Sequence, residues 1–120
     1  MTLIKLTNEF DRTYNKTQWG ENVTHSVKWS GAFCSPGCIH VYQDLVVALM
    51  LNPVHANFQH PHAWEAEGDV LLSDKGRKFG VAKLTTVKRI EPLPIVTNIH
   101  RVAFGILCAL EVYEDKQFQI

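Results

Sequence analysis

The sequence has no excess of charge of either sign: twelve lysines and arginines are balanced by twelve aspartates and glutamates. Proteins that bind nucleic acid without reading its sequence usually carry a basic excess, so the balance argues against general nucleic-acid binding. Long apolar runs are also missing, since the longest, Leu45 to Leu51, is far short of the about 20 residues of a membrane-spanning helix. No signal-peptide pattern begins the chain. We therefore expect a cytoplasmic protein with no membrane partner.

Cysteine is scarce, and its odd count does not fit a closed disulfide framework. The three cysteines are Cys34, Cys38 and Cys108. Two of these thiols and the imidazole of His40 stand within seven residues, which is part of a zinc-ligand set. Candidates for a fourth ligand are His55, His60 and His62, but no second cysteine pair follows. We therefore expect reduced cysteines, no metal and no other cofactor.

The composition is that of one globular domain over residues 1–120, with 46% hydrophobic and 20% charged residues. Val81 to Ile90 shows the clearest alternation of apolar and polar residues, and Pro92 and Pro94 end it. Shorter strands are expected at Thr2–Thr7, Val23–Trp29, Cys38–Tyr42 and Ala63–Leu72. Because strands and helices do not alternate regularly, we expect an α+β fold with a four- or five-stranded, mostly antiparallel sheet and two helices.

Of the two expected helices, the C-terminal one is the longer. The first begins after Asp44, whose carboxylate suits an N-cap, and ends at Asn52 because Pro53 follows. The second runs from about Thr97 to Glu114 and carries two apolar ridges. The larger ridge consists of Ile99, Val102, Ala103, Ile106, Leu110 and Tyr113, and the smaller one of Phe104, Cys108 and Val112.

We expect the larger ridge to face the sheet and to complete the hydrophobic core. The expected core consists of Ile39, Val41, Leu45, Ala48, Leu49, Val81, Leu84, Ile99, Ala103, Ile106 and Leu110. The smaller ridge then needs another cover, either the loop of residues 53–61 or a second subunit in a two-fold homodimer. Because the net charge is zero, no long-range repulsion opposes self-association.

One short strand offers the most specific polar pattern in the sequence. Extended backbone places Cys38, His40 and Tyr42 on one face, while Ile39 and Val41 on the other face point to the core. The three side chains of the polar face then line the space on that side of the sheet.

Further polar residues extend this candidate site. Two glutamates separated by one residue follow Trp64, and a carboxylate pair near a histidine and a tyrosine suits acid–base chemistry or a polar pocket. A loop rich in histidine and asparagine follows the first helix. The candidate ligand-binding residues are His40, Tyr42, Asn52, His55, Trp64, Glu65 and Glu67, and catalytic residues stay unassigned.

Several motifs, in order and spacing, resemble a family of small proteins of tailed bacteriophages for which no activity is known. These motifs are Cys34–Tyr42, Asp44–Ala48, Leu51–Asn57, Trp64–Gly68, Lys83–Thr86, Leu93–Pro94 and Arg101–Ala109. The resemblance spans nearly the whole chain and implies a phage origin and a location in the host cytoplasm. In that family the position of Cys38 is often aromatic, which further argues against zinc.

A fainter resemblance is to ADP-ribosyltransferase-like domains, in which a strand containing histidine or tyrosine leads directly into a helix. Glu65 and Glu67 resemble their Glu-x-Glu pair. However, the first strand has Lys5 where those domains have arginine or histidine, the glutamate pair comes early in the chain, and their Ser-Thr-Ser strand is missing.

Three functions follow as expectations. The first is a phage-derived accessory protein that binds a host protein or a nucleotide-like small molecule, as in counter-defence, and that forms a homodimer. The second is an ADP-ribosyltransferase-like or other nucleotide-processing enzyme with His40, Tyr42 and a glutamate as working groups. The third is a component of the virion or of its assembly.

Overall fold

The structure is a computed structural model that describes residues 2–33 and 37–117, and for residues 54 and 112–117 it describes the backbone alone. Within these ranges the chain has the expected α+β fold, with antiparallel strands and two α-helices of which the C-terminal one is the longer. The expectations for Cys34 and for the side chains of Val112 and Tyr113 concern parts of the chain outside this description.

Nine strands occur in the described ranges. They are β1 (Leu3–Thr7), β2 (Arg12–Thr13), β3 (Thr17–Gln18), β4 (Val23–Ser26), β5 (Ile39–Val41), β6 (His62–Glu67), β7 (Leu72–Asp74), β8 (Lys78–Val81) and β9 (Lys83–Arg89). Helix α1 (Leu45–His55) follows β5, and helix α2 (Asn98–Gln117) follows β9. A 3-10 turn at Tyr14–Lys16 links β2 to β3.

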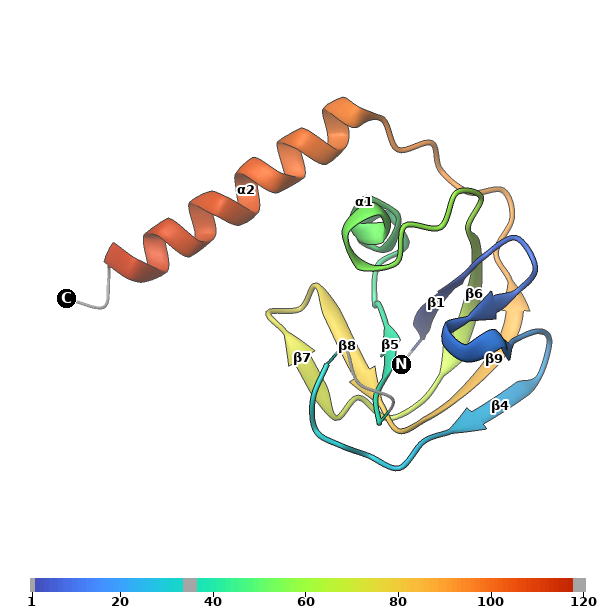
Figure 1. Cartoon of the computed structure of the whole chain (residues 1–120). Helices are drawn as coiled ribbons and strands as arrows, with labels where there is room; N and C mark the ends of the chain where they lie inside the picture. Colours follow the sequence, from blue (N-terminus) through green and yellow to red (C-terminus); the bar gives the residue numbers. More distant parts are fainter. Residues whose placement is uncertain (1, 34–36, 118–120) are drawn as a thin grey trace.

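The strands form two main sheets that curve around a shared interior (Figure 1). One sheet has the order β1-β6-β9-β4 and the other has the order β5-β8-β7, and neighbouring strands are antiparallel. A bridge between Ile4 and Tyr42 joins β1 to β5, and Ala82 alone separates β8 from β9. These links place β5 and β1 side by side, which matters for the candidate site.

Two hydrophobic cores lie on opposite faces of β1. The first fills the interior between the sheets and contains Leu3, Trp19, Ile39, Val41, Ala66, Phe79, Val81 and Leu84. The second lies against α1 and contains Ile4, Leu6, Tyr42, Ala48, Leu49 and Ala63. From the expected core, the buried residues are Ile39, Val41, Ala48, Leu49, Val81 and Leu84, with Leu45 partly buried.

Two expected strands differ in extent from the observed ones. The stretch Ala63–Leu72 contains most of β6 and only the first residue of β7. It is interrupted near Gly68, where an added Cβ would lie 2.7 Å from the carbonyl oxygen of Lys83, so the two backbones approach closely. The stretch Val81–Ile90 contains the end of β8 and all of β9.

Helix α1 begins where the sequence predicts and ends later. The carboxylate of Asp44 accepts hydrogen bonds from the backbone N–H groups of Val46 and Val47 at 2.8 and 3.1 Å, which caps the helix. The prediction that Pro53 ends the helix is wrong, because α1 continues to His55 with Pro53 in its last turn. A proline so close to the end removes only one helical hydrogen bond.

Asn52 stabilises the end of α1. Its backbone carbonyl accepts hydrogen bonds from the N–H groups of Ala56 and Asn57. Its side chain holds the backbone of Phe58 at both ends: Nδ2 donates to the carbonyl at 2.9 Å, and Oδ1 accepts from the N–H at 3.0 Å. Because Phe58 packs on the second core, this clamp fixes the chain after the helix.

Replacing Asn52 with alanine is expected to lower the free energy of unfolding by about 1–3 kcal/mol, because two partly buried backbone groups lose their partner. Urea denaturation measures the change. The matched control is Gln59→Ala at an exposed neighbouring position, expected to stay within about 0.5 kcal/mol of the wild type. An Asn52 variant as stable as this control would contradict the clamp.

Helix α2 begins where the sequence predicts but turns the opposite face toward the body. Four residues predicted to lie in the core are exposed instead: Ile99, Ala103, Ile106 and Leu110. Their assignment to the core is therefore wrong. The half-buried side of α2 carries Arg101, Phe104 and Cys108.

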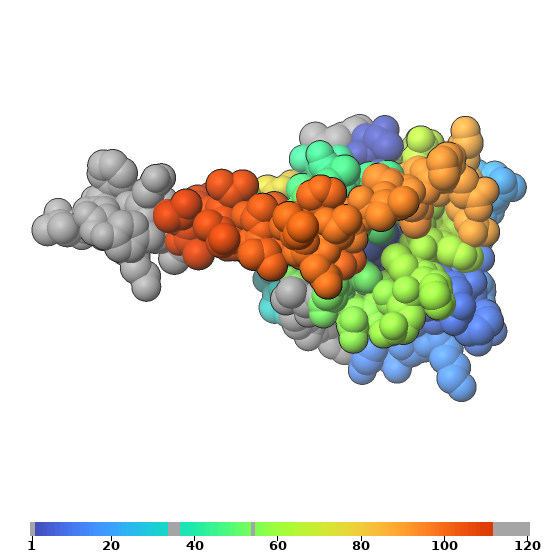
Figure 2. Space-filling view, turned by 90° about the horizontal axis from the view of Figure 1, so that it is seen from above, coloured from blue at the N-terminus to red at the C-terminus, as the bar shows by residue number. Residues whose placement is uncertain are grey.

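The path of the preceding segment explains this reversal. Residues 90–97, which include Pro92 and Pro94, carry the chain away from the end of β9 and past α1. Helix α2 then runs across the top of the molecule and extends beyond it (Figures 1 and 2). The path of residues 90–97 thus determines which side of α2 contacts α1. The larger apolar ridge lies on the other side and stays exposed.

Candidate anion-binding site

The polar face of β5 is the starting point of the candidate site. Ile39 and Val41 are buried in the first core, as predicted, so Cys38, His40 and Tyr42 lie on the opposite face. Cys38 and Tyr42 are themselves buried, whereas His40 is half-buried. His40 is therefore the member of this face that a ligand can reach.

Strand β8 brings Lys78 beside this face. His40 pairs with Gly80, and Lys78, two residues before Gly80, points to the same side of the sheet. Lys78 is only 8% exposed, and its Nζ lies 4.7 Å from the centre of the Phe33 ring. Among the described residues, none makes a hydrogen bond or an ion pair with this ammonium group.

A second lysine, Lys5 of β1, reaches the same strand. Its Nζ donates a hydrogen bond to the backbone carbonyl of His40 at 2.8 Å and lies 5.7 Å from the centre of the Trp19 ring. Burial lowers the pKa of Lys5 to about 8, a shift that the nearby Cys38 opposes. At neutral pH this group is therefore a buried cation.

Tyr42 and His55 form a coupled pair at the end of α1. The phenol oxygen lies 2.8 Å from Nδ1 of His55, and the two rings are nearly parallel with centres 6.0 Å apart. Burial raises the pKa of Tyr42 to about 12, so the phenol keeps its proton. In the tautomer in which Tyr42 donates to Nδ1, neutral His55 carries its proton on Nε2 and presents it as a donor.

Both histidines of this region are held in the neutral form. Burial, and then the charges of Lys5, Lys78 and His55, lower the pKa of His40 to about 4. Burial and the charge of Lys78 also lower the pKa of His55, and Asp74 opposes this shift. The two lysines therefore act as the cations of the region, and the imidazoles act as neutral polar groups.

These side chains make up what we term the cationic cluster: Lys5, His40, Tyr42, His55 and Lys78. They come from β1, β5, α1 and β8; Lys5 reaches the backbone of β5 from the side of the first core, whereas the other four side chains belong to the opposite face of β5. The ring of Phe33 borders the cluster, with its centre 5.7 Å from that of His40. Positive charge next to aromatic surface is suited to an anion that carries a ring.

The structure unites only part of the predicted site. His40, Tyr42 and His55 come together, and Asn52 lies nearby with its side chain occupied by Phe58. Trp64 is buried opposite Lys5 on β6, and its indole Nε1 has no hydrogen-bond partner among the described residues.

The predicted glutamates lie apart from this cluster. Glu65 and Glu67 are exposed on β6, where they pair with Lys88 and Thr85 of β9. Strand β1 separates β6 from β5, so the backbone of Glu65 stands two strands, or about 10 Å, from that of Tyr42. No carboxylate from this pair therefore reaches the cationic cluster.

Sequence reasoning missed the two lysines of the cluster. The sequence did contain an indication that Lys5 is buried, because this lysine stands between Ile4 and Leu6. All five residues of the strand are buried in the structure. Lys78 follows the polar residues 74–77, and no local pattern distinguishes its burial from the exposure of Lys75. The position of Lys78 depends on the pairing of β8 with β5.

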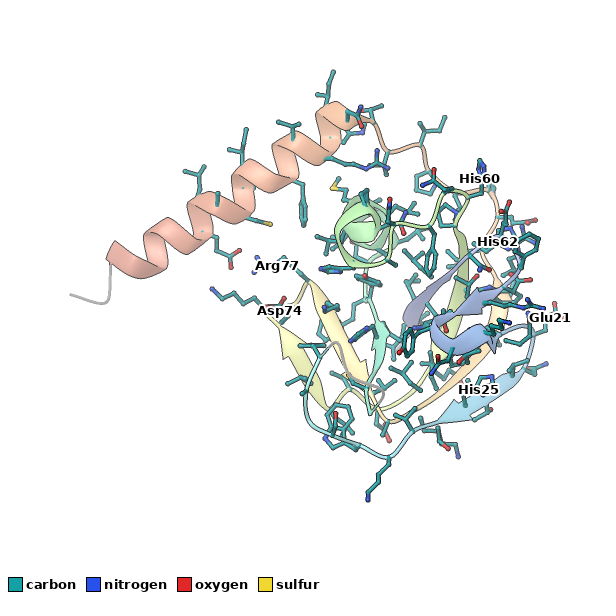
Figure 3. The ribbon with its side chains drawn as sticks, viewed as in Figure 1. Glu21, His25, His60, His62, Asp74 and Arg77 are labelled. Carbon is teal, nitrogen blue, oxygen red and sulfur yellow. The ribbon has the colours of Figure 1, made fainter. Side chains whose placement is uncertain are left out.

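A second polar network lies at the start of β6, around His62, which Figure 3 labels together with His60. Nδ1 of His62 lies 2.7 Å from a carboxylate oxygen of Asp11, and Nη2 of Arg89 lies 2.9 Å from Nε2. Because arginine only donates, Nε2 of His62 accepts this hydrogen bond. Arg89 also pairs with Glu91 at 2.9 Å, so these groups satisfy one another beside a hollow of about 520 Å³.

Two classes of site find no support in the described residues. No three histidine, cysteine, aspartate or glutamate side chains there lie close enough to hold a metal ion. No helix in the same part of the chain is long and apolar enough to cross a membrane.

Comparison with known proteins adds no relative to this description. No model of a protein family matches the chain, and no curated protein matches its sequence.

Proposed function

We propose that the protein is a binding protein for a small anionic ligand with a ring, of the nucleotide-like class, and that the cationic cluster holds the anion. The observation that carries the proposal is Lys78, a residue only 8% exposed whose ammonium group makes no hydrogen bond or ion pair among the described residues, although its cross-strand neighbour Asp74 is acidic. Burying a cation without an anionic partner is costly, and a bound phosphate or carboxylate offsets that cost.

The rest of the cluster suits the same ligand. Lys5 adds a second positive charge from the first-core side of β5, where it contacts the carbonyl of His40, and neutral His55 offers an N–H donor to an oxyanion. The Phe33 ring stands next to Lys78 and His40 and offers a surface on which a base can stack.

Binding is favoured over catalysis by the positions of the candidate reactive groups. The amine of Lys5 has a lowered pKa, but it is buried and engaged by the carbonyl of His40. The carboxylates of Glu65 and Glu67 lie two strands away from Tyr42. Together with the resemblance to phage proteins, this supports a role in sequestering a host nucleotide, as a counter-defence protein would.

Titration of the full chain with adenosine diphosphate, and separately with inorganic phosphate, tests the proposal by calorimetry. We expect the wild type to bind the nucleotide with a dissociation constant below about 1 mM. Lys78→Gln is expected to weaken binding by at least about tenfold, because one charge-assisted contact is lost. Raising the pH from 7 to 9 is expected to weaken it as well, because Lys5 loses its proton near pH 8.

The matched control is Lys83→Gln, which removes the same charge from an exposed position on β9. It is expected to bind as the wild type does. If Lys78→Gln and Lys83→Gln lose the same affinity, the effect comes from the overall charge and not from the cationic cluster. A wild type that binds neither probe at about 10 mM would contradict the proposed function.

A further inference from the structure

Six of the eleven large apolar side chains that are exposed among the described residues lie on the outer side of α2 or just before it. The large aliphatic side chains of this outer side, together with Ile95 just before the helix, are each more than half exposed. These residues, termed the outer face, are Ile95, Ile99, Val102, Ile106, Leu107 and Leu110, with exposures of 87, 80, 62, 56, 64 and 52%. Apolar side chains scattered singly over a surface need no explanation, but these six are contiguous.

The orientation of α2 is fixed by its inner side. Arg77 in the β7–β8 turn donates to a carboxylate oxygen of Glu111 at 2.8 Å, and its Nη1 also lies 3.9 Å from the sulfur of Cys108. Figure 3 shows Arg77 and Asp74 at the end of this hairpin that lies nearest α2. At about 100° per residue, Cys108 points roughly opposite to Ile106, so anchoring one side directs the other to solvent.

The size of the outer face matches that of a specific protein interface. Six aliphatic residues exposed to this degree present on the order of 700 Å² of surface, whereas a stable complex buries about 800 Å² on each partner. The largest apolar patch of a typical monomer is about 300–600 Å². One helix therefore supplies nearly the whole of one side of such an interface.

Spacing and charge favour another copy of the same helix as the partner. Apolar residues recur at alternating intervals of four and three, the pattern of helices that pair with like helices. Within α2 they are Ile99, Val102, Ile106 and Ala109, and Ile95 continues the spacing in the segment before the helix. Between Asn98 and Leu110 the only lysine, arginine, aspartate or glutamate is Arg101, which lies on the half-buried side.

We propose that the outer face of α2 pairs with the outer face of a second copy, forming a two-fold dimer. An uncharged surface offers nothing to attract a charged partner, and it offers no repulsion to an identical one. Two-fold pairing buries the same six side chains on both copies and leaves the Arg77 contact in place. This inference is independent of the proposed ligand, because the outer face contains no residue of the cationic cluster.

Sedimentation equilibrium of the full chain from about 1 to 100 µM tests the dimer. We expect a wild-type dimer at tens of micromolar and at least about a hundredfold weaker association for Ile106→Glu, which places a charge in the middle of the interface. Leu71→Glu is the matched control, since Leu71 is 54% exposed and lies outside α2; it is expected to dimerise normally.

Ile99→Lys is a second variant at the other end of the face, and circular dichroism verifies that each variant is folded. A wild type that stays monomeric at about 100 µM would overturn the proposal and leave the face to a different protein. A dimer that persists in both folded variants would also overturn it, because the contact must then lie elsewhere.

Discussion

Replacing Leu84 with alanine is expected to lower the free energy of unfolding by about 2–5 kcal/mol. Leu84 is fully buried in the first core, between the two sheets. Its Cδ1 would lie 3.3 Å from a Cβ added at Gly68, so backbone already packs tightly against it. Such a site has little room to collapse around the missing atoms, and the cavity adds to the lost transfer free energy.

The matched control for this variant is Leu107→Ala, the same chemical change at a position that is 64% exposed. Urea denaturation at a concentration where the chain is monomeric is expected to give a change within about 0.5 kcal/mol. Similar losses in the two variants would mean that α2 is packed into the body, in disagreement with its exposed outer face.

The sequence predicts the strands of this protein better than it predicts the placement of its last helix. In β5 the two-residue alternation of apolar and polar side chains is enough to assign both faces of the strand. Ile39 and Val41 face the first core, and the residues between and beside them face the other way because the backbone is extended. In α2 the period of 3.6 indicates that an apolar stripe exists, but it does not say what covers the stripe. The path of residues 90–97 decides that, and no local pattern encodes it.

The same distinction applies to the candidate site. His40 and Tyr42 share a face by local geometry, so their neighbourhood could be predicted. Lys5 and Lys78 join them only through the pairing of β1 and β8 with β5, which depends on contacts distant in sequence. Glu65 pairs with Ile4, which in turn bridges to Tyr42, so Glu65 shares a face with Tyr42 but stands two strands away from it.

Lys5 gives the protein an unusual dependence of stability on pH. In the unfolded chain its amine has the ordinary pKa of 10.5, whereas burial lowers the pKa in the folded chain to about 8. Between these two values the unfolded state binds more protons than the folded state. Stability therefore rises with pH in this window, because the cost of a buried cation disappears as the folded protein releases its proton.

We expect the free energy of unfolding to increase by about 2–3 kcal/mol between pH 7 and pH 10, from a pKa difference of about 2.5 at 1.36 kcal/mol per unit. Denaturant titrations across this range measure it, and they stop at pH 10 because Tyr42, whose pKa is raised, contributes with the opposite sign above it. In Lys5→Met the increase is expected to vanish, whereas Lys83→Met, at an exposed position, is expected to retain it.

Lys5→Met is also expected to bind the anionic ligand more weakly at pH 7, since it lacks one of the two charges of the cationic cluster. An unchanged slope in Lys5→Met would show that the amine is solvated in the folded state, and it would remove Lys5 as a buried cation of the site.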